Sequence, residues 1–152
     1  MADINHRVGI KAPVSKVYAA LSTIEGIAGW WTKHTSGSSR VGGTIEVRFH
    51  STDGKEIGCM KMEVMALDPN KTVHWRVQAG PEEWVGTAVV FTLHQDGDYA
   101  IVLFAHKDWR EVNEFTSHCS MKWAMFMLSL RELVEGGKGK PSPDDVKIDN
   151  WN

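Results

Sequence analysis

Four side chains that could carry out acid–base chemistry lie in one connecting segment in the last third of the chain. His106 with Asp108, or Glu111 with Glu114, would supply the groups that general acid–base catalysis uses, and the segment precedes a long predicted helix. Nothing in their spacing requires a catalytic pair. We therefore identify no catalytic residue and keep an enzymatic role only as an alternative.

The cysteines and the other histidines point to structural roles. His118 and Cys119 are adjacent, but neighbours on a helix diverge by about 100°, which places them poorly as base and nucleophile. His6 falls on the apolar face of a predicted strand, where a hydrogen-bonded, partly buried histidine is commoner than a base. Two cysteines, Cys59 and Cys119, are too few for a disulfide framework and are expected to be free thiols. His, Cys, Asp and Glu nowhere cluster at metal-ligand spacing, so we expect no metal site.

Composition and charge exclude several classes of protein. A chain of 152 residues fits one domain with its own core, and a formal charge of −2 gives no overall attraction to nucleic acid or to an anionic membrane. No apolar run reaches transmembrane length and no signal peptide is recognisable, so we expect a cytoplasmic protein without membrane insertion. The phosphate-binding patterns GxGxxG and the P-loop are absent, and we expect no cofactor.

The N-terminal third is predicted to hold one strand and two short helices. Residues 4–11 alternate apolar and polar side chains, which is typical of a half-buried strand. A helix begins near Pro13, a residue suited to a first helical turn, and a shorter helix covers residues 25–31. A link rich in Gly and Ser, TSGSSRVGG, follows.

The rest of the chain is predicted to form an antiparallel sheet covered by one long helix. Apolar residues recur at every second position over residues 44–107, and the turn sequences TDGK, DPNK and QDGD separate the runs. The last helix runs from Ser117 to about residue 135 and ends at two glycines. Residues 1–136 then form a single domain, and residues 137–152 form a polar, loosely ordered tail.

The period of two also predicts which side chains of the sheet face the final helix. They are Ile45, Val47, Phe49, Met62, Trp75, Val77, Phe91 and Leu103. A helix is the element that can cover such an apolar face. A sheet that curves around a helix can leave space between them that side chains do not fill.

Two segments of the sequence resemble a known family. VYAALSTIEGIAGWWT and the closing CSMKWAMFMLSLRELVEGG are similar to the domain of activators of the heat-shock-protein-90 ATPase, and the order of elements resembles the helix-grip fold of the START and birch-pollen-allergen superfamily (SRPBCC). The resemblance covers about residues 4–136. It implies an α+β fold in which a curved antiparallel sheet wraps around the long C-terminal helix, with two short helices after the first strand. It also implies a cavity for an apolar or amphipathic ligand.

Adjacent tryptophans stand in the short second helix. Neighbours in a helix or strand cannot share one face, so we expect one of Trp30 and Trp31 to point inward and the other to lie on the surface. The outward one is either an ordinary exposed ring or part of a lid over the cavity, and we favour the lid because Gly26 and Gly29 permit movement. Trp84 and Trp109 fall in predicted connections and fit a pocket rim.

The residues that we expect to bind the ligand follow from the implied cavity and the predicted inward faces. They are Trp30, Trp31, Phe49, Met62, Trp75, Phe91, Leu103, Trp123 and Met127. The favoured function is binding of an apolar small molecule, and the alternative is a polyketide cyclase or aromatase on the same fold. Activation of a chaperone ATPase comes third, because those activators carry a further domain before this one and we expect none here.

The first turns of the last helix are apolar nearly all round. Met121, Met125 and Leu128 lie opposite its main apolar stripe. Such a patch is covered either by the lid segment or by a second subunit. In the second case we expect a weak homodimer.

Overall fold

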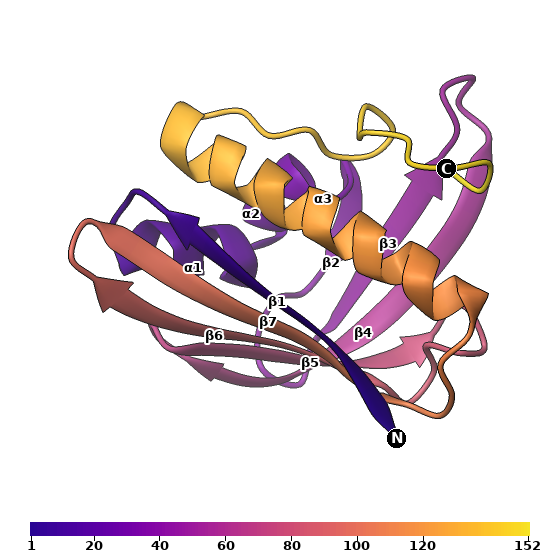
Figure 1. Ribbon diagram of the computed structural model, residues 1–152, viewed down its shortest axis with the longest axis horizontal. Coiled ribbons are helices and arrows are strands. Elements are labelled where there is room, and N and C mark those ends of the chain that lie inside the picture. Colours follow the sequence, from indigo (N-terminus) through magenta and orange to yellow (C-terminus); the bar gives the residue numbers. More distant parts are fainter.

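The computed structural model describes residues 1–152 and consists of one seven-stranded sheet and three helices. The elements are β1 (Ala2–Ile10), α1 (Val14–Ser22), α2 (Ile24–Trp30), β2 (His34–Gly37), β3 (Thr44–His50), β4 (Glu56–Asp68), β5 (Thr72–Ala79), β6 (Ala88–Asp96), β7 (Tyr99–Trp109) and α3 (Glu114–Gly136). The strand order is β1-β7-β6-β5-β4-β3-β2, with every neighbouring pair antiparallel. Figure 1 shows the sheet curving around α3, which confirms the predicted α+β helix-grip fold.

The predicted turns are present, but one strand was not predicted. The backbone turns back within each of the three expected turn sequences, with positive φ at Gly54, Asn70 and Gly97. The strand β2 lies in the segment that the sequence indicated as a Gly- and Ser-rich link. It pairs with β3 along the sheet edge, from His34 opposite Arg48 to Gly37 opposite Ile45. A short polar edge strand has no buried face, so its sequence carries no period-two signal.

Both ends of α3 are fixed by local sequence. Asn113 and Thr116 form a capping box at the N-terminus, which starts the helix three residues earlier than the predicted Ser117. At the C-terminus Gly137 takes the left-handed conformation, φ 84°, that ends many helices. The helix α2 is held close to α1 because Gly26 has no Cβ: one would come within 2.6 Å of the Ala20 backbone.

Most of the predicted inward face of the sheet is buried, and Leu103 is the exception. Leu103 is 41% exposed on the outer face of β7, whereas its neighbours Val102 and Phe104 are buried. The prediction for Leu103 was therefore wrong. The segment from residue 99 to 105 is apolar on both faces, so alternation could not tell which face turned inward.

Both tryptophans at the end of α2 are buried, which corrects the expectation that one lies on the surface. Trp30 is 0% exposed and Trp31 1% exposed. The helix ends between them, because Trp31 is the C-cap residue with φ −101° and ψ −69°. Trp31 N still donates to Ile27 O at 2.9 Å, and both rings are buried because the end of α2 is enclosed on more than one side, with Phe91 beside Trp30. Trp31 packs into the sheet side of the core against Trp75, with ring centroids 6.0 Å apart.

The C-terminal tail, defined as residues 138–152, runs back beside α3 (Figure 1) instead of extending away from the domain. Ser142 pairs with the chain after α2, accepting from Lys33 N at 3.1 Å and donating to Trp31 O at 2.8 Å. Ser129 of α3 donates to Trp30 O and accepts from Lys140 N, each at 2.8 Å. The structure thus differs from the loose tail that its polar composition predicted, because its polar groups are paired with the domain. None of the helices is both long and apolar enough to span a membrane.

Candidate functional site

A cavity of about 210 Å³ lies between α3, the β3–β4 end of the sheet and the C-terminal tail. The sheet contributes Phe49 and residues 57–60, and the loop between β5 and β6 contributes Pro81 and Trp84. One face of α3, from Phe115 to Phe126, forms a second wall. The end of α2 contributes Trp31, and the tail supplies the rest, with Asp145 and the last two residues of the chain. Most of the lining residues are hydrophobic.

Aromatic rings make up much of the lining. Trp123 lies at the centre, with its ring centroid 5.0 Å from that of Trp31 and 5.8 Å from that of Trp84. The Trp84 and Trp123 planes are inclined by only 17°, and Phe49 meets Trp31 at 65°. The rings pack on one another to form the wall, and the apolar surface that they leave toward the cavity suits contact with a planar apolar molecule.

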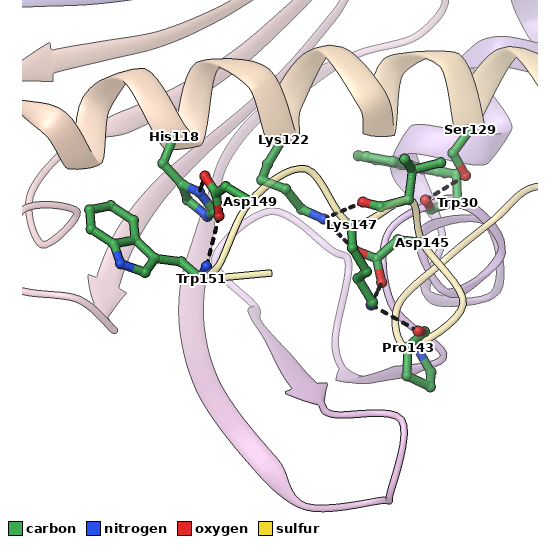
Figure 2. A network of polar contacts seen from close by, with 10 residues as sticks. Trp30, His118, Lys122, Ser129, Pro143, Asp145, Lys147, Asp149 and Trp151 are labelled. Atoms are coloured by element: carbon green, nitrogen blue, oxygen red, sulfur yellow. Dashed lines mark hydrogen bonds and ion pairs between the residues drawn. The ribbon is translucent and has the colours of Figure 1, made fainter.

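Charged side chains lie where α3 meets the tail (Figure 2). Lys122 Nζ donates to Asp145 Oδ2 at 2.5 Å, and Lys147 Nζ donates to Asp145 Oδ1 at 2.8 Å. One turn earlier on α3, His118 Nδ1 is 2.7 Å from Asp149 Oδ2, and this hydrogen bond holds the pKa of Asp149 below its usual value. The cavity wall therefore contains both signs of charge, already paired within the chain.

The thiol in the wall is unsuited to act as a nucleophile. Cys119 is buried, and burial raises its pKa to about 12. Its sulfur accepts a hydrogen bond from Trp84 Nε1 at 3.4 Å. Because the thiolate is the reactive form, Cys119 stays a neutral packing group at physiological pH. Cys59, the other residue of this type, is also a free thiol, as predicted.

A buried polar chain lies behind the aromatic wall. Trp123 Nε1 donates to His106 Nδ1 at 3.1 Å, so the ring proton of His106 is on Nε2, which donates to Thr87 Oγ1 at 2.8 Å. Thr87 in turn donates to Trp84 O at 2.5 Å. Burial lowers the pKa of His106 to about 3, which keeps the imidazole neutral. This chain fixes Trp84 and Trp123 in place.

The acid–base pair suggested by the sequence is not formed. His106 lies within β7 and faces inward, whereas Asp108 is exposed and has a φ of 72° at the irregular end of that strand. The connection that the sequence placed here begins only after Trp109. Glu111 and Glu114 are both exposed. Neither pair converges on the cavity.

The structure divides the nine predicted ligand-binding residues into three groups. Those that line the cavity are Trp31, Phe49 and Trp123. Those that are buried in the core without lining it are Trp30, Met62, Trp75, Phe91 and Met127. Leu103 is on the outer face of the sheet.

Apart from Trp123, sequence reasoning missed the cavity residues contributed by α3 and the tail. Lys122 and Cys119 fall beside the main apolar stripe of α3, and periodicity alone indicates no role for them. Asp145 and Trp151 belong to a tail whose path cannot be read from its polar composition. The one available signal was Trp151 itself, since a tryptophan near the end of a polar tail suggests a contact with the domain.

The fold and the cavity together define a helix-grip protein of the SRPBCC class. Within that class the chain belongs to the family described as Activator of Hsp90 ATPase homolog 1-like protein, whose model matches residues 11–135. A search of curated proteins gives no match.

Solved structures show the same fold. The solution structure of the Aha1 dimer from Colwellia psychrerythraea is 44% identical, covers 91% of this chain and 100% of that chain, and has a TM-score of 0.77. DynU16, from the dynemicin biosynthetic locus, is 19% identical with a TM-score of 0.76 over 90% of this chain and 48% of that one. An AHSA1-like protein from Aeromonas hydrophila is 12% identical with a TM-score of 0.73 over 90% and 94% of the two chains.

Proposed function

We propose that this protein binds an apolar, planar small molecule in the cavity between α3, the sheet and the C-terminal tail. The observation that carries the proposal is the cavity itself, about 210 Å³ in volume and lined by several aromatic rings. An apolar cavity of about 150 Å³ can hold benzene. The space here is larger than that and is open on one side, so it suits a ligand of two or three rings.

A glycine in β4 keeps part of this space open. Gly58 pairs with Phe49 of β3, and directly opposite residues of an antiparallel pair have their side chains on the same face. Phe49 lines the cavity, so a side chain at position 58 would point into it. A Cβ added at Gly58 would meet no atom within 4 Å. The missing side chain at this position is thus one physical cause of the cavity.

The test uses N-phenyl-1-naphthylamine, a neutral two-part aromatic probe whose fluorescence rises in apolar surroundings. We expect the wild type to bind it, and Gly58→Phe to weaken binding by about tenfold or more, the equivalent of 1.4 kcal/mol, because the new ring fills the cavity. Gly136→Phe is the matched control, since that glycine also has free space around it but lies at the end of α3 away from the cavity. A wild type that binds no such probe, or a Gly58→Phe variant that binds it equally well, would refute the proposal.

We also propose that the chain forms a homodimer, as the 44% identical relative from Colwellia psychrerythraea does. Met121 and Leu128, 54% and 38% exposed, lie two turns apart on α3. Next to them the tail exposes Trp151 and Val146, which border the same surface hollows as Met121 and Leu128 respectively. An apolar surface of this kind fits contact with a second copy.

A further inference from the structure

The C-terminal tail places one carboxylate in the cavity wall, and its partner is on α3. The Asp145 side chain is only 2% exposed, and Lys122 is 13% exposed. Besides Asp145, the Lys122 ammonium donates to Val146 O at 2.9 Å and lies 5.2 Å from the centre of the Phe126 ring. Figure 2 shows Lys122 reaching from α3 toward the tail. Both Lys122 and Asp145 line the cavity.

The two partners belong to parts of the fold with different constraints. Lys122 is in the middle of a 23-residue helix, whose backbone hydrogen bonds fix its position. Asp145 is in a segment without helix or strand, and residues 144–147 are attached to the domain mainly through side-chain ion pairs. These four residues can move away without breaking a helix or a strand, whereas Lys122 cannot.

Local release of the tail would leave a charge without a partner. Asp145 and Lys147 would enter water together, and Lys122 would stay beside aromatic rings with no anion near it. A ligand that fills the space left by the tail keeps water away from Lys122, and an ammonium without a partner in such a place is costly. A ligand that brings its own anionic group removes that cost, and a neutral ligand does not.

We propose that the cavity selects planar apolar molecules that carry an anionic group, and that Asp145 occupies the position of this anion at Lys122 in the ligand-free protein. The tail is then a competitor built into the chain. The inference rests on the proposed ligand-binding function and adds the charge of the ligand to it. The other basic side chain in the wall, His118, pairs with Asp149, whose side chain is 35% exposed, whereas the Asp145 side chain at Lys122 is 2% exposed, so the deeper position for an anion is the one at Lys122.

Two probes with the same aromatic skeleton separate charge from apolar binding. N-phenyl-1-naphthylamine is neutral, and 1-anilinonaphthalene-8-sulfonate carries one sulfonate in addition. In Asp145→Asn the competing charge is gone, so we expect the sulfonate probe to bind about tenfold tighter than to the wild type, the gain from one charge-assisted hydrogen bond. The neutral probe should change by less than about twofold. Asp144→Asn is the matched control, because Asp144 pairs with Lys33 at the surface and does not line the cavity.

The double variant Lys122→Met/Asp145→Asn shows whether Lys122 is the anion's partner. It removes both members of the pair and leaves no buried charge, so it should fold, and the gain for the sulfonate probe should disappear while the neutral probe still binds. Equal gains for both probes in Asp145→Asn, or a gain that persists in the double variant, would overturn the inference and leave the proposed function standing. Failure of every variant and the wild type to bind either probe would overturn both.

Discussion

Trp30 and Trp31, consecutive in the chain, stack on each other with ring centroids 5.8 Å apart and planes inclined by 9°. The two rings have different contacts. Trp30 is held by a hydrogen bond from its Nε1 to Ala20 O at 2.9 Å, whereas Trp31 continues the stack toward Trp75 and reaches the cavity. The pair thus connects the short helices to the site.

Separate substitutions of the two tryptophans should affect stability alike and binding differently. Trp30→Phe and Trp31→Phe each remove buried volume, and each should lower the free energy of unfolding by about 1–3 kcal/mol in urea denaturation. Only Trp31→Phe should change the affinity for N-phenyl-1-naphthylamine, because Trp30 does not line the cavity. If Trp30→Phe altered probe binding more than Trp31→Phe did, the assignment of the cavity wall would be wrong.

The orientation of β7 leads to a second prediction, which concerns the stability of two variants. Leu103 is on the outer face, so Leu103→Thr should change the free energy of unfolding by no more than about 0.5 kcal/mol. Phe104 is 2% exposed and packs against Trp123 at 4.6 Å between centroids, so Phe104→Ala should cost about 3–5 kcal/mol. Chemical denaturation of the two variants checks this, and a larger loss for Leu103→Thr would show that the strand faces the other way.

The contrast between these neighbours shows what the sequence could predict. Turn residues and helix ends are encoded locally, which is why the hairpins and the glycine stop at Gly137 were found. The facing of β7 was not predicted, since both faces of its middle are apolar and its facing depends on pairing across the sheet, where Phe104 lies opposite Phe91 of β6. Periodicity assigns a side only when the two sides differ.

The cavity depends on contacts that no local pattern encodes. Gly58 creates space only because it stands opposite Phe49, and Asp145 reaches the wall only because the tail runs back along α3. The prediction selected large apolar side chains that face inward, which is a property of the whole core. Three of these residues also line the cavity. Which part of that core stays empty is a property of tertiary packing.

If the protein is a dimer as proposed, one substitution on its surface should halve the mass of the particle in solution. Met121→Glu places a charge in the exposed apolar surface of α3, so the protein should sediment as a monomer at concentrations where the wild type is a dimer. Met125, which the sequence places in the same patch, is half-buried, so Met121 is the better position for this substitution. Val41→Glu, at a residue 60% exposed in the loop between β2 and β3, should leave the dimer intact. A wild type that is monomeric at high concentration contradicts the proposal.

The last prediction concerns the neutral histidine behind the cavity. Burial lowers the pKa of His106 from 6.5 to about 3, so between these values the unfolded chain binds a proton that the folded protein does not. Stability from the neutral ring is complete above pH 6.5 and is lost as the pH falls, by about 2 kcal/mol between pH 7.5 and pH 5. His74, whose pKa is also lowered by burial, acts in the same direction at a more exposed site. The carboxyls of Asp144 and Asp149, with pKa values lowered by hydrogen bonds from Lys33 and His118, lose stabilisation only below their usual value of 3.8 and do not contribute in this range.

A matched variant isolates the contribution of His106. In His106→Gln the amide can accept from Trp123 and donate to Thr87 as the imidazole does, but it does not titrate. Urea denaturation at pH 7.5 and pH 5 should therefore show most of the 2 kcal/mol difference disappearing in the variant, whatever its stability at neutral pH. A wild type equally stable at both pH values, or a variant with an unchanged pH dependence, would contradict this prediction. Either result would mean that the folded protein binds a proton on His106 at pH 5. A protonated Nδ1 could not accept the hydrogen bond from Trp123 Nε1.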